Sequence, residues 1–502
     1  MRALEIFAPI LVFFAFLVWL SLRSRDKPET GFLSEYFLGG RSLRGFVLAM
    51  SLVATYGSVS SFVSGPGLAW RFGLGWVAFA APQIITGFLV LGVLGSKLAL
   101  IGRRLGAVTV IDVLAARFQS RALAIYLAAL LLIFFTAMMV GQFIGGAQII
   151  SQAAGIGYVP GLLIFGLIVV FYTSFGGFRA VALTDAACAV LMVAGMFFLG
   201  SSIVQEAGGW DRLIEQIHAA DEQHDIGLFS PTSNGALPWS LLFSAWILVG
   251  FATAALPQSA VRCLAYKKSE DLKRAMLVAT VVCGALMIGM TMMGFLARAV
   301  LPEEAAFGGN TDAMIPYLIA HHMSPWMAGL TLIGPLAATM STVSSLLIAA
   351  SSAIIKDIFI RLAPEKGRDG LLRRAQGCTF GLGALALILA IFPLDLIAWI
   401  NLFAFGGLEI AFLCPLIGGL FWARATAKAA FASVTAGLLF YLGAGLCHWP
   451  LGGWHAVVPS LAISALVFVI VALLTAPAEP SAVFFPDKAR KSPSRRDGGL
   501  GG

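Results

Sequence analysis

The sequence predicts an all-α integral membrane protein that crosses the bilayer many times. Of its 502 residues, 59% are hydrophobic and only 12% are charged, and the mean hydropathy is +0.91. In soluble domains about a quarter of the residues are charged, so this composition excludes a soluble enzyme. Apolar runs of about 18 residues or more recur along the chain, and each is long enough to cross a membrane as a helix. The lipid bilayer is therefore the first partner that we expect.

Thirteen apolar segments predict thirteen transmembrane helices. The first segment is long for a signal peptide and has no small-residue cleavage site before Arg23, so we expect a membrane helix there. Pro, Ser, Gly and Arg dominate residues 477–502, which predicts a disordered cytoplasmic tail after a single transmembrane domain over residues 1–476. The expected helices span residues 5–22, 46–70, 76–101, 122–152, 159–175, 180–205, 239–261, 275–300, 325–355, 372–392, 395–422, 427–447 and 455–476.

The distribution of Lys and Arg predicts the orientation of the chain. If the N-terminus lies outside and the thirteen helices alternate, 29 of the 33 Lys and Arg residues fall on the inner side, as the positive-inside rule requires. We therefore expect a multi-pass protein of the cell inner (plasma) membrane, with its N-terminus outside and its C-terminus in the cytoplasm. The net charge of +8 follows from these inner loops, so we expect no nucleic-acid partner.

Two of the expected helices are interrupted by small polar residues, Gly and Pro. Ten of the seventeen positions from Ser51 to Gly67 are of these types, and Gly250–Ser259 carries a similar interruption. Lipid offers no hydrogen-bond partners, so a broken helix persists only where it lines a cavity. The two broken helices are the second and the seventh, five helices apart, and they cross the membrane in opposite directions. This predicts a five-helix unit repeated once in inverted orientation, with a transport site near the midplane. The alternative is that small residues merely allow helices to pack closely.

The ninth expected helix contains a run of hydroxyl side chains between Ala338 and Ser345. The hydroxyls of Ser341 and Thr342 lie one turn from the carbonyl of Ala338, and an unwound second helix would offer free carbonyls opposite them. Oxygen ligands without fixed charge suit a hard monovalent cation such as sodium. The alternative is that each hydroxyl bonds to a carbonyl of its own helix, as is common in membrane helices.

Ionisable residues inside a membrane helix cost roughly 2.5–3.5 kcal/mol at its centre, so each needs a reason. Glu409 falls in the middle of the eleventh helix, where we expect a functional role or a buried hydrogen-bond hub. Asp185 lies one turn into the sixth helix, where it either belongs to the ion path or stabilises a helix start. Polar or aromatic groups also occur at membrane depth, and each could instead bond between helices: Gln83, Gln142, Trp246 and Asn401.

Other chemistries find no support in the residue patterns. The six cysteines include no CxxC pair, the six histidines show no metal-ligand spacing, and no phosphate-binding GxxxxGK[ST] loop is present. A membrane-embedded enzyme would need a clustered nucleophile, base and orienting acid, which the sequence does not offer. A channel would not need the inverted pair of broken helices. No pattern favours one oligomeric state.

Several segments between about residues 36 and 475 resemble the sodium:solute symporter family. The family motifs correspond to Tyr36–Leu43, Thr173–Ala180, Thr184–Asp185, Met340–Thr342, Ser351–Asp357 and Gly419–Lys428. Within the family, the chain is most similar to members that transport pantothenate. This likeness lies in Ser64–Gly67, Gln142–Ala147, Ala260–Cys263, Tyr266–Lys267 and Asn401–Glu409.

The resemblance implies a leucine-transporter-type core, with a first repeat over residues 46–205, an inverted second repeat over 239–422 and two extra helices over 427–476. It also implies one sodium site, and hence Na⁺ as the coupling ion. The ligands carried over are the carbonyls of Ala54, Gly57 and Ala338 and the hydroxyls of Ser341 and Thr342. Asp185 matches an acidic position that is tied to sodium handling in relatives.

The resemblance further implies sodium-coupled uptake of a small organic anion, with pantothenate as the expected solute. The alternative is another small solute: a monocarboxylate, proline or another amino acid. Proline-transporting members have an acidic residue where this chain has Tyr56, and they lack Glu409. Depth and polarity suggest these contacts for the solute: Ser60, Ser61, Gln83, Gln142, Trp246 and Asn401. No Lys or Arg is expected at mid-depth, so the solute's carboxylate would lie at the N-terminus of a half-helix.

Overall fold

The computed structural model describes residues 2–24, 32–363, 370–392, 396–476 and 482–486. Within these ranges the chain is helical throughout, apart from loops and one isolated bridge between Leu43 and Tyr266. The expected all-α membrane architecture is confirmed. The expected tail falls largely outside the described residues, but residues 482–486 are placed, and Phe484 in them is only 3% exposed.

Nine long helical stretches of the described chain are apolar enough to cross a membrane. Two bent pairs of shorter helices also qualify and raise this number to eleven. The nine stretches are α1 (Arg2–Arg23), Leu74–Leu105, α8 (Arg121–Ala154), α9 (Tyr158–Glu206), α13 (Ser269–Ala297), Pro325–Leu362, α18 (Ile397–Phe421), α19 (Ala427–Leu446) and α20 (Val457–Leu474). Two of them are composite. Leu74–Leu105 contains α5 (Leu74–Ala80), η3 (Ala81–Ile85), η4 (Phe88–Leu94) and α6 (Gly95–Leu105), and Pro325–Leu362 contains α15 (Pro325–Ser352), η10 (Ala353–Phe359) and α16 (Ile360–Leu362).

The difference between eleven and thirteen lies in two places. The expected helices 159–175 and 180–205 fall in one helix, α9, whose 49 residues are interrupted by a non-helical backbone at Gly177 (φ 71°, ψ 177°). At about 1.5 Å per residue this helix is more than twice as long as the hydrocarbon core is thick. The other place is α17 (Leu371–Leu389), which carries Arg373 and Arg374 near its start and is not among the selected stretches.

The two expected interruptions are confirmed as bends. The first pair comprises α3 (Gly45–Tyr56), η2 (Ser60–Ser64) and α4 (Gly65–Phe72), bent by 66°. The second comprises α11 (Trp239–Ala245), η6 (Trp246–Gly250), η7 (Phe251–Ala255), α12 (Pro257–Ala260) and η8 (Val261–Leu264), bent by 46°. The remaining short helices are α2 (Phe32–Leu38), η1 (Gly39–Arg41), α7 (Val110–Phe118), α10 (Trp210–His224), η5 (Ser233–Gly235), η9 (Glu304–Phe307) and α14 (Thr311–His322).

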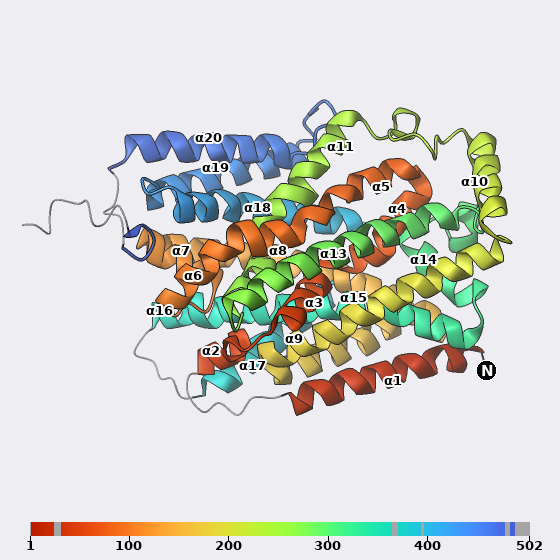
Figure 1. The fold of residues 1–502 in the computed structure, drawn as a ribbon, viewed down its shortest axis with the longest axis horizontal. Coiled ribbons are helices and arrows are strands. Elements are labelled where there is room, and N and C mark those ends of the chain that lie inside the picture. The colour runs from red at the N-terminus through yellow and green to blue at the C-terminus, as the bar shows by residue number, and fades with distance from the viewer. Residues whose placement is uncertain (1, 25–31, 364–369, 393–395, 477–481, 487–502) are drawn as a thin grey trace, which may run out of the picture.

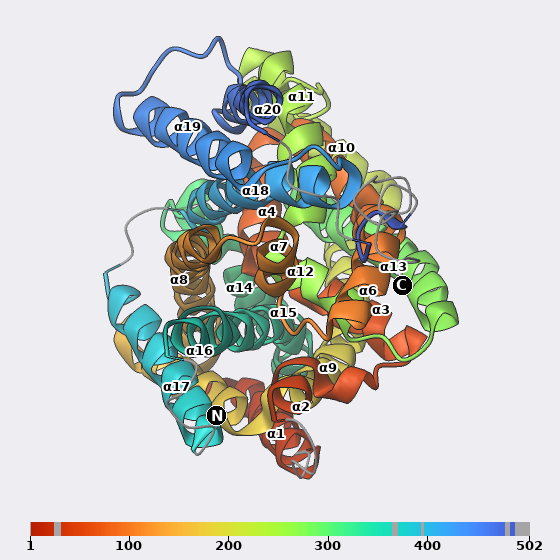
Figure 2. The same cartoon turned by 90° about the vertical axis from the view of Figure 1, so that its left-hand side faces the viewer.

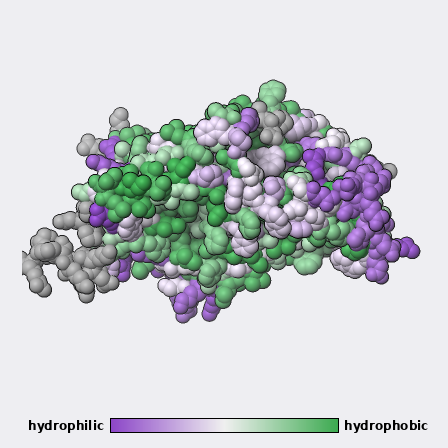
Figure 3. Space-filling model, turned by 90° about the horizontal axis from the view of Figure 1, so that it is seen from above, coloured by the Kyte–Doolittle hydropathy of each residue, from purple (hydrophilic) through white to green (hydrophobic). Residues whose placement is uncertain are grey.

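The long helices run side by side along the molecule (Figure 1). Seen from one end, α15 and α12 lie near the middle, while α1 and α17 lie at one edge and α19 and α20 at the other (Figure 2). Figure 3 shows hydrophilic side chains gathered at the end that holds α10 and hydrophobic ones over α20. This surface is that of a multi-pass membrane protein, whose apolar belt faces lipid.

Two glycines bring α4, the second half of the first bent pair, into backbone contact with its neighbours. A Cβ on Gly294 of α13 would lie 1.8 Å from the carbonyl oxygen of Pro66 in α4. A Cβ on Gly67 would lie 2.2 Å from the carbonyl oxygen of Thr311, the first residue of α14. No side chain fits at these distances, so α4, α13 and α14 pack with their backbones touching.

Candidate functional site

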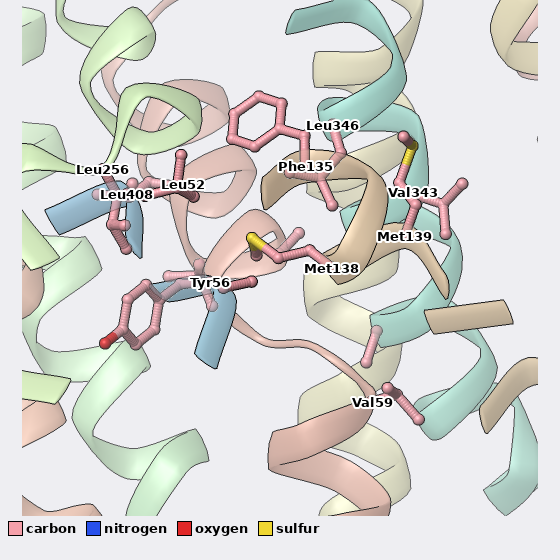
Figure 4. Packing of buried hydrophobic residues seen from close by; sticks show 14 of the residues in the cluster. Leu52, Tyr56, Val59, Phe135, Met138, Met139, Leu256, Val343, Leu346 and Leu408 are labelled. Atoms are coloured by element: carbon pink, nitrogen blue, oxygen red, sulfur yellow. The ribbon is translucent and has the colours of Figure 1, made fainter. Parts of the chain in front are cut away.

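The first bend leaves backbone oxygens without helical partners. Helix α3 ends at Tyr56, Gly57 takes an extended backbone (φ −68°, ψ 105°), and the chain becomes helical again near Val59. Figure 4 shows this coil between Tyr56 and Val59, inside the protein. Helix ends expose the last carbonyl groups, which must find other partners when they are buried. The interruption of the helix between Ser51 and Gly67 therefore leaves carbonyl oxygens free to accept other partners.

The hydroxyl side chains of α15 meet these free oxygens. The Ser341 hydroxyl lies 2.9 Å from the carbonyl oxygen of Ala54 and 3.1 Å from that of Ala338. The Thr342 hydroxyl lies 3.2 Å from the carbonyl oxygen of Gly57 and 3.0 Å from that of Ala338. All five residues are buried. The structure thus brings together the five residues expected as sodium ligands.

This oxygen cluster suits a small hard cation. Each of its oxygens belongs to a carbonyl or a hydroxyl group, so none carries a full charge, and oxygen ligands of this kind prefer hard metal ions to soft ones. Among the described residues no group of three or more His, Cys, Asp or Glu residues could hold a transition metal. The cluster lies between two long elements, α3 and α15, so an ion bound there would tie them together.

A buried ion pair lies one turn further along α15. The guanidinium of Arg262 donates to the carboxylate of Asp185 at 3.1 Å, and the two side chains are 1% and 0% exposed. Arg262 also donates to the hydroxyls of Ser345 at 2.8 Å and Ser51 at 3.2 Å, and to the carbonyl of Gln258 at 2.5 Å. These groups come from α3, α9, α12, η8 and α15, so one guanidinium links the first bent pair, the second bent pair and two long helices.

The ion pair and the oxygen cluster are connected. The hydroxyls of Thr55 and Ser345 lie 3.0 Å apart, and Thr55 is the neighbour of the ligand Ala54. Asp185 still has one carboxylate oxygen without a hydrogen-bond partner among the described residues. Arg262 directly follows the expected helix 239–261, so the charge count assigns it to the inner loop after that helix. The structure instead buries it completely, because its partner Asp185 is brought there by a helix 77 residues away.

A small cavity lies next to the first bend and is partly lined by its residues. It offers about 60 Å³ of space to water-sized molecules. Its lining contains no Lys, Arg, Asp or Glu and comprises Tyr56, Ser58, Ser60, Ser61, Gly65, Trp76, Phe79, Ala80, Gln83, Val249, Met287, Thr291, Ala398, Asn401, Leu402 and Phe405. Four of the six expected solute contacts are in this lining, namely Ser60, Ser61, Gln83 and Asn401.

Gln142 lies behind the cavity wall rather than in it. Its side chain is fully buried, and its carbonyl oxygen accepts a hydrogen bond at 3.0 Å from the backbone N–H of Val59. Its amide nitrogen donates to Asn401 at 3.4 Å, and Asn401 donates to the hydroxyl of Ser60 at 2.5 Å. Gln142 therefore satisfies one of the N–H groups freed by the bend and positions two residues of the lining.

Trp246 lies outside this assembly. It is 44% exposed and is not part of the cavity lining. Among the aromatic residues of the lining, Trp76, Phe79 and Phe405 were not expected as solute contacts. Tyr56 and Phe405 approach with ring centroids 6.5 Å apart, and Trp76 stacks on Phe79 at 4.5 Å. The spacing of Ala398, Asn401, Leu402 and Phe405 along one face of α18 was the signal that could have found that wall.

Glu409 continues this face of α18, one turn beyond Phe405. Its side chain is fully buried, and neither carboxyl oxygen has a hydrogen-bond partner among the described residues. Buried polar atoms without partners are rare in native proteins and often mark functional positions. Glu409 lies outside the cavity lining in this conformation.

Asp312 of α14 links Ser64 of the first bent pair to the start of α18. The hydroxyl of Ser64 donates to its carboxylate, and so does the backbone N–H of Ile397, at 2.9 Å. The Ser64 hydroxyl in turn accepts from the backbone N–H of Ala398 at 3.0 Å. A carboxylate at the start of α18 also interacts favourably with the dipole of this helix. Asp312 thus joins the first bent pair to α18 next to two residues of the cavity lining, Gly65 and Ala398.

Comparison with known proteins places these residues in a family. The family model of the sodium:solute symporter family matches residues 36–437. The chain is 41% identical over 472 residues to the sodium/pantothenate symporter of Escherichia coli (strain K12), covering 93% of this chain and 96% of that protein. It is 39% identical over 473 residues to the sodium/pantothenate symporter of Haemophilus influenzae, with the same shares covered. The osmoregulated proline transporter of Bacillus subtilis is 27% identical over 463 residues, which are 89% of this chain and 90% of that one.

Solved structures show the same fold. A Na⁺-coupled sialic acid symporter in a substrate-bound, outward-open state matches with a TM-score of 0.76 at 21% identity, over 95% of this chain and 99% of that one. The nucleobase-cation-symport-1 family transporter Mhp1 in a closed conformation matches with a TM-score of 0.54 at 16% identity, over 91% of this chain and 97% of that one. With a family model that matches most of its length, and relatives at about 40% identity over nearly all of it, this chain belongs to the sodium:solute symporter family.

Proposed function

We propose that this protein imports pantothenate together with sodium by alternating access. It is a transporter and not an enzyme, because its family and its relatives consist of sodium symporters. The observation that carries the proposal is the cluster of five uncharged oxygens at the first bend, which also contributes residues to the lining of a small cavity. The relatives at about 40% identity are sodium/pantothenate symporters, which favours pantothenate over the alternatives.

Sodium would bind at the oxygen cluster as the co-transported ion. The proposed ligands are the carbonyls of Ala54, Gly57 and Ala338 and the hydroxyls of Ser341 and Thr342. Both hydroxyls lie within hydrogen-bond distance of these carbonyls, so each can donate to one of them when it does not bind an ion. Asp185 is a proposed coupling residue, because its network reaches the cluster through Ser345 and Thr55. Glu409 is a second coupling candidate, because its carboxyl group is buried without a partner.

Pantothenate would bind in the cavity. Its hydroxyl and amide groups match the side chains of Ser60, Ser61, Gln83 and Asn401, and its apolar carbons match the aromatic walls. Its carboxylate needs a positive partner, which the start of the outer half-helix Ser60–Phe72 would supply through its N–H groups and dipole. Gln142 would position this half-helix, while Trp246, which is exposed, would take part only in another conformation. Tyr56 in the lining, in place of an acidic residue, argues against proline.

The cavity must enlarge to accept this solute. Ligand pockets usually measure about 300–1,000 Å³, so the 60 Å³ available here corresponds to a contracted arrangement. Opening on the outer side requires the links through Asp312 to separate. Sodium bound between α3 and α15 would favour the conformation that also binds the solute. By linkage, the solute would then raise the affinity for sodium by the same factor.

The finer topology belongs to the same proposal. Counting α9 as two spans that meet at Gly177, and α17 as a further span, gives the thirteen transmembrane helices expected from the sequence. The two bent pairs then occupy equivalent positions in an inverted repeat of five helices, over residues 46–205 and 239–422, with 427–476 as two extra helices. The positive-inside rule places the N-terminus outside the plasma membrane and the C-terminus in the cytoplasm.

Uptake by proteoliposomes tests this function. Vesicles that contain the purified chain should accumulate labelled pantothenate against its gradient when sodium is higher outside, and should not do so with potassium. Unlabelled pantothenate should compete, whereas proline, short monocarboxylates and sugars should not. Competition and sodium-driven accumulation of one of these other solutes would replace pantothenate with that solute. Equilibration without accumulation would overturn symport altogether.

A further inference from the structure

A long apolar groove runs along the outside of the second bent pair. It has a volume of about 710 Å³ and is lined by η4, the turns η6 and η7, α18 and α20. Every lining residue is apolar: Leu89, Val93, Leu94, Ile247, Phe251, Ala252, Ala254, Ala255, Leu413, Leu416, Ile417, Phe421, Val458, Leu461, Ala462 and Ala465. Several of them are well exposed, including Phe251 at 52% and Ile417 at 48%.

The groove lies within stretches that cross the membrane. Its walls belong to Leu74–Leu105, α18, α20 and the second bent pair, all of which are long and apolar enough to be membrane spans. Water gains no hydrogen bond from such walls, so an apolar hollow of this size is filled by hydrocarbon when it faces a bilayer. The matching occupant is an acyl chain.

Basic side chains stand at one end of the groove. The ammonium group of Lys97 lies 4.8 Å from the ring centroid of Phe421, the last residue of α18, and 5.0 Å from that of Phe485. Lys97 and Arg104 line a second hollow of about 550 Å³. Its lining comprises Ser96, Lys97, Leu100, Ile101, Arg104, Val483, Phe484, Phe485 and Pro486. In the described ranges, the ion pairs of this end of the molecule involve Lys356 and Arg361 instead.

One helical face joins the two hollows. Positions 89 and 93 line the groove, and positions 97, 100 and 104 line the basic hollow, at spacings of three or four residues along the stretch Leu74–Leu105. Residues at this spacing lie on one face of a helix. The apolar groove therefore leads directly to the basic hollow.

We propose that the groove and the basic hollow together bind one anionic phospholipid. One acyl chain lies in the groove, and the phosphate of the headgroup lies on Lys97 and Arg104. Clusters of basic residues next to a membrane span attract anionic headgroups, and a pocket between helices holds them in place. The segment with Phe484 and Phe485 covers the headgroup hollow from the aqueous side.

The position of the groove gives such a lipid a role in transport, provided that the proposed function holds. Phe251, Ala252, Ala254 and Ala255 belong to η7, directly before the bend at Leu256. An acyl chain against them supports the second bent pair in its present arrangement. The binding of the lipid does not itself depend on which solute is carried.

Counting bound lipid tests the proposal without a transport assay. The full chain is equilibrated with mixed vesicles of phosphatidylcholine and phosphatidylglycerol, purified in mild detergent and weighed by native mass spectrometry. We expect one retained phosphatidylglycerol per chain. Ala462→Trp, which fills the groove, should abolish this retention. Lys97→Gln should lower it about fivefold, the effect of one basic residue near an anionic surface.

Matched controls separate the site from general effects of the substitutions. Ala129→Trp places the same ring on an exposed face of α8, and Lys428→Gln removes an exposed charge at the start of α19. Both should retain phosphatidylglycerol like the unchanged chain. Equal retention by Ala462→Trp and Ala129→Trp would overturn the acyl-chain site. Equal preference for phosphatidylcholine and phosphatidylglycerol, with and without Lys97, would overturn the headgroup site. A failure of pantothenate uptake in the separate assay would leave these lipid counts unchanged.

Discussion

The two bent helical pairs contain similar breaks, but they are completed by opposite chemistry. At the first, bent by 66°, free carbonyl oxygens meet the hydroxyls of Ser341 and Thr342, and no charged group takes part. Beyond the second, bent by 46°, Arg262 brings a permanent positive charge that is paired with Asp185. The groups at the first break are neutral and are proposed to bind sodium, whereas the positive charge near the second break is the side chain of Arg262.

This difference predicts that the first break affects sodium affinity, while the second affects the stability of the fold. At the proposed sodium site, neutral oxygens would bind a cation without the fixed negative charge that would hold it tightly. A buried guanidinium and carboxylate cannot separate without leaving a charge in an apolar interior, so the loss of either one destabilises the fold. We therefore expect substitutions at the first break to change the response to sodium and substitutions near the second to change the stability of the fold.

The largest expected effect is that of Arg262→Ala. It leaves the carboxylate of Asp185 buried without its cation, which costs about 3–5 kcal/mol in known cases. The unfolding temperature of the purified chain should fall sharply, as measured by thermal unfolding in detergent. The double variant Asp185→Asn/Arg262→Gln removes both charges and should recover much of the loss. If Arg262→Ala unfolds at the original temperature, the pair does not hold the helices together.

The next effect is that of Gly294→Ala on α13, where α13 packs against α4 of the first pair. Its new methyl group would collide with the carbonyl of Pro66, and such overpacking costs about 1–3 kcal/mol. The unfolding temperature should fall, but less than for Arg262→Ala. Gly381→Ala on α17 is the control, since nothing lies within 4 Å of its added Cβ. Equal unfolding temperatures for the two variants would contradict the tight packing of α4 on α13.

The smallest effect on the fold, and the one specific to sodium, is that of Ser341→Ala or Thr342→Ala. The loss of one ligand oxygen should raise the sodium concentration for half-maximal uptake about tenfold, or about 1.4 kcal/mol. The unfolding temperature should change little. Thr339→Ala is the control on the same helix, because its hydroxyl donates to the carbonyl of Pro335 and lies outside the cluster. An unchanged sodium response in both ligand variants would remove the assignment.

The sequence was most informative where local composition decides the structure. A run of Ser, Gly and Pro in an apolar span cannot form an ordinary membrane helix, so both bends were predictable to within a few residues. The approach of Ser341 and Thr342 to the first bend was one of two readings of their spacing, and the resemblance to a family favoured it. Spacing within one helix places these hydroxyls on a face but does not select the helix opposite.

The sequence was least informative where the partner comes from elsewhere in the chain. Arg262 stands next to Cys263 and near other basic residues, so charge counting assigned it to a loop; only folding brings Asp185 to it. Gln142 and Trp246 were chosen for depth and polarity alone. Which face of a helix such residues occupy depends on neighbouring helices, and the winding of η6 around Trp246 departs from a regular α-helix.

The backbone contacts of Gly67 and Gly294 determine which part of the first pair can move. Since α4 touches α13 and α14 with no side chain between them, any change in the angle of α4 against these helices is opposed by backbone contacts. Gly57 and Ser58, the two non-helical residues beside the oxygen cluster, have no such helical constraint on their backbone torsions. The most adjustable part of the first pair thus lies next to the proposed ion ligands, and an ion bound there would stiffen the bend.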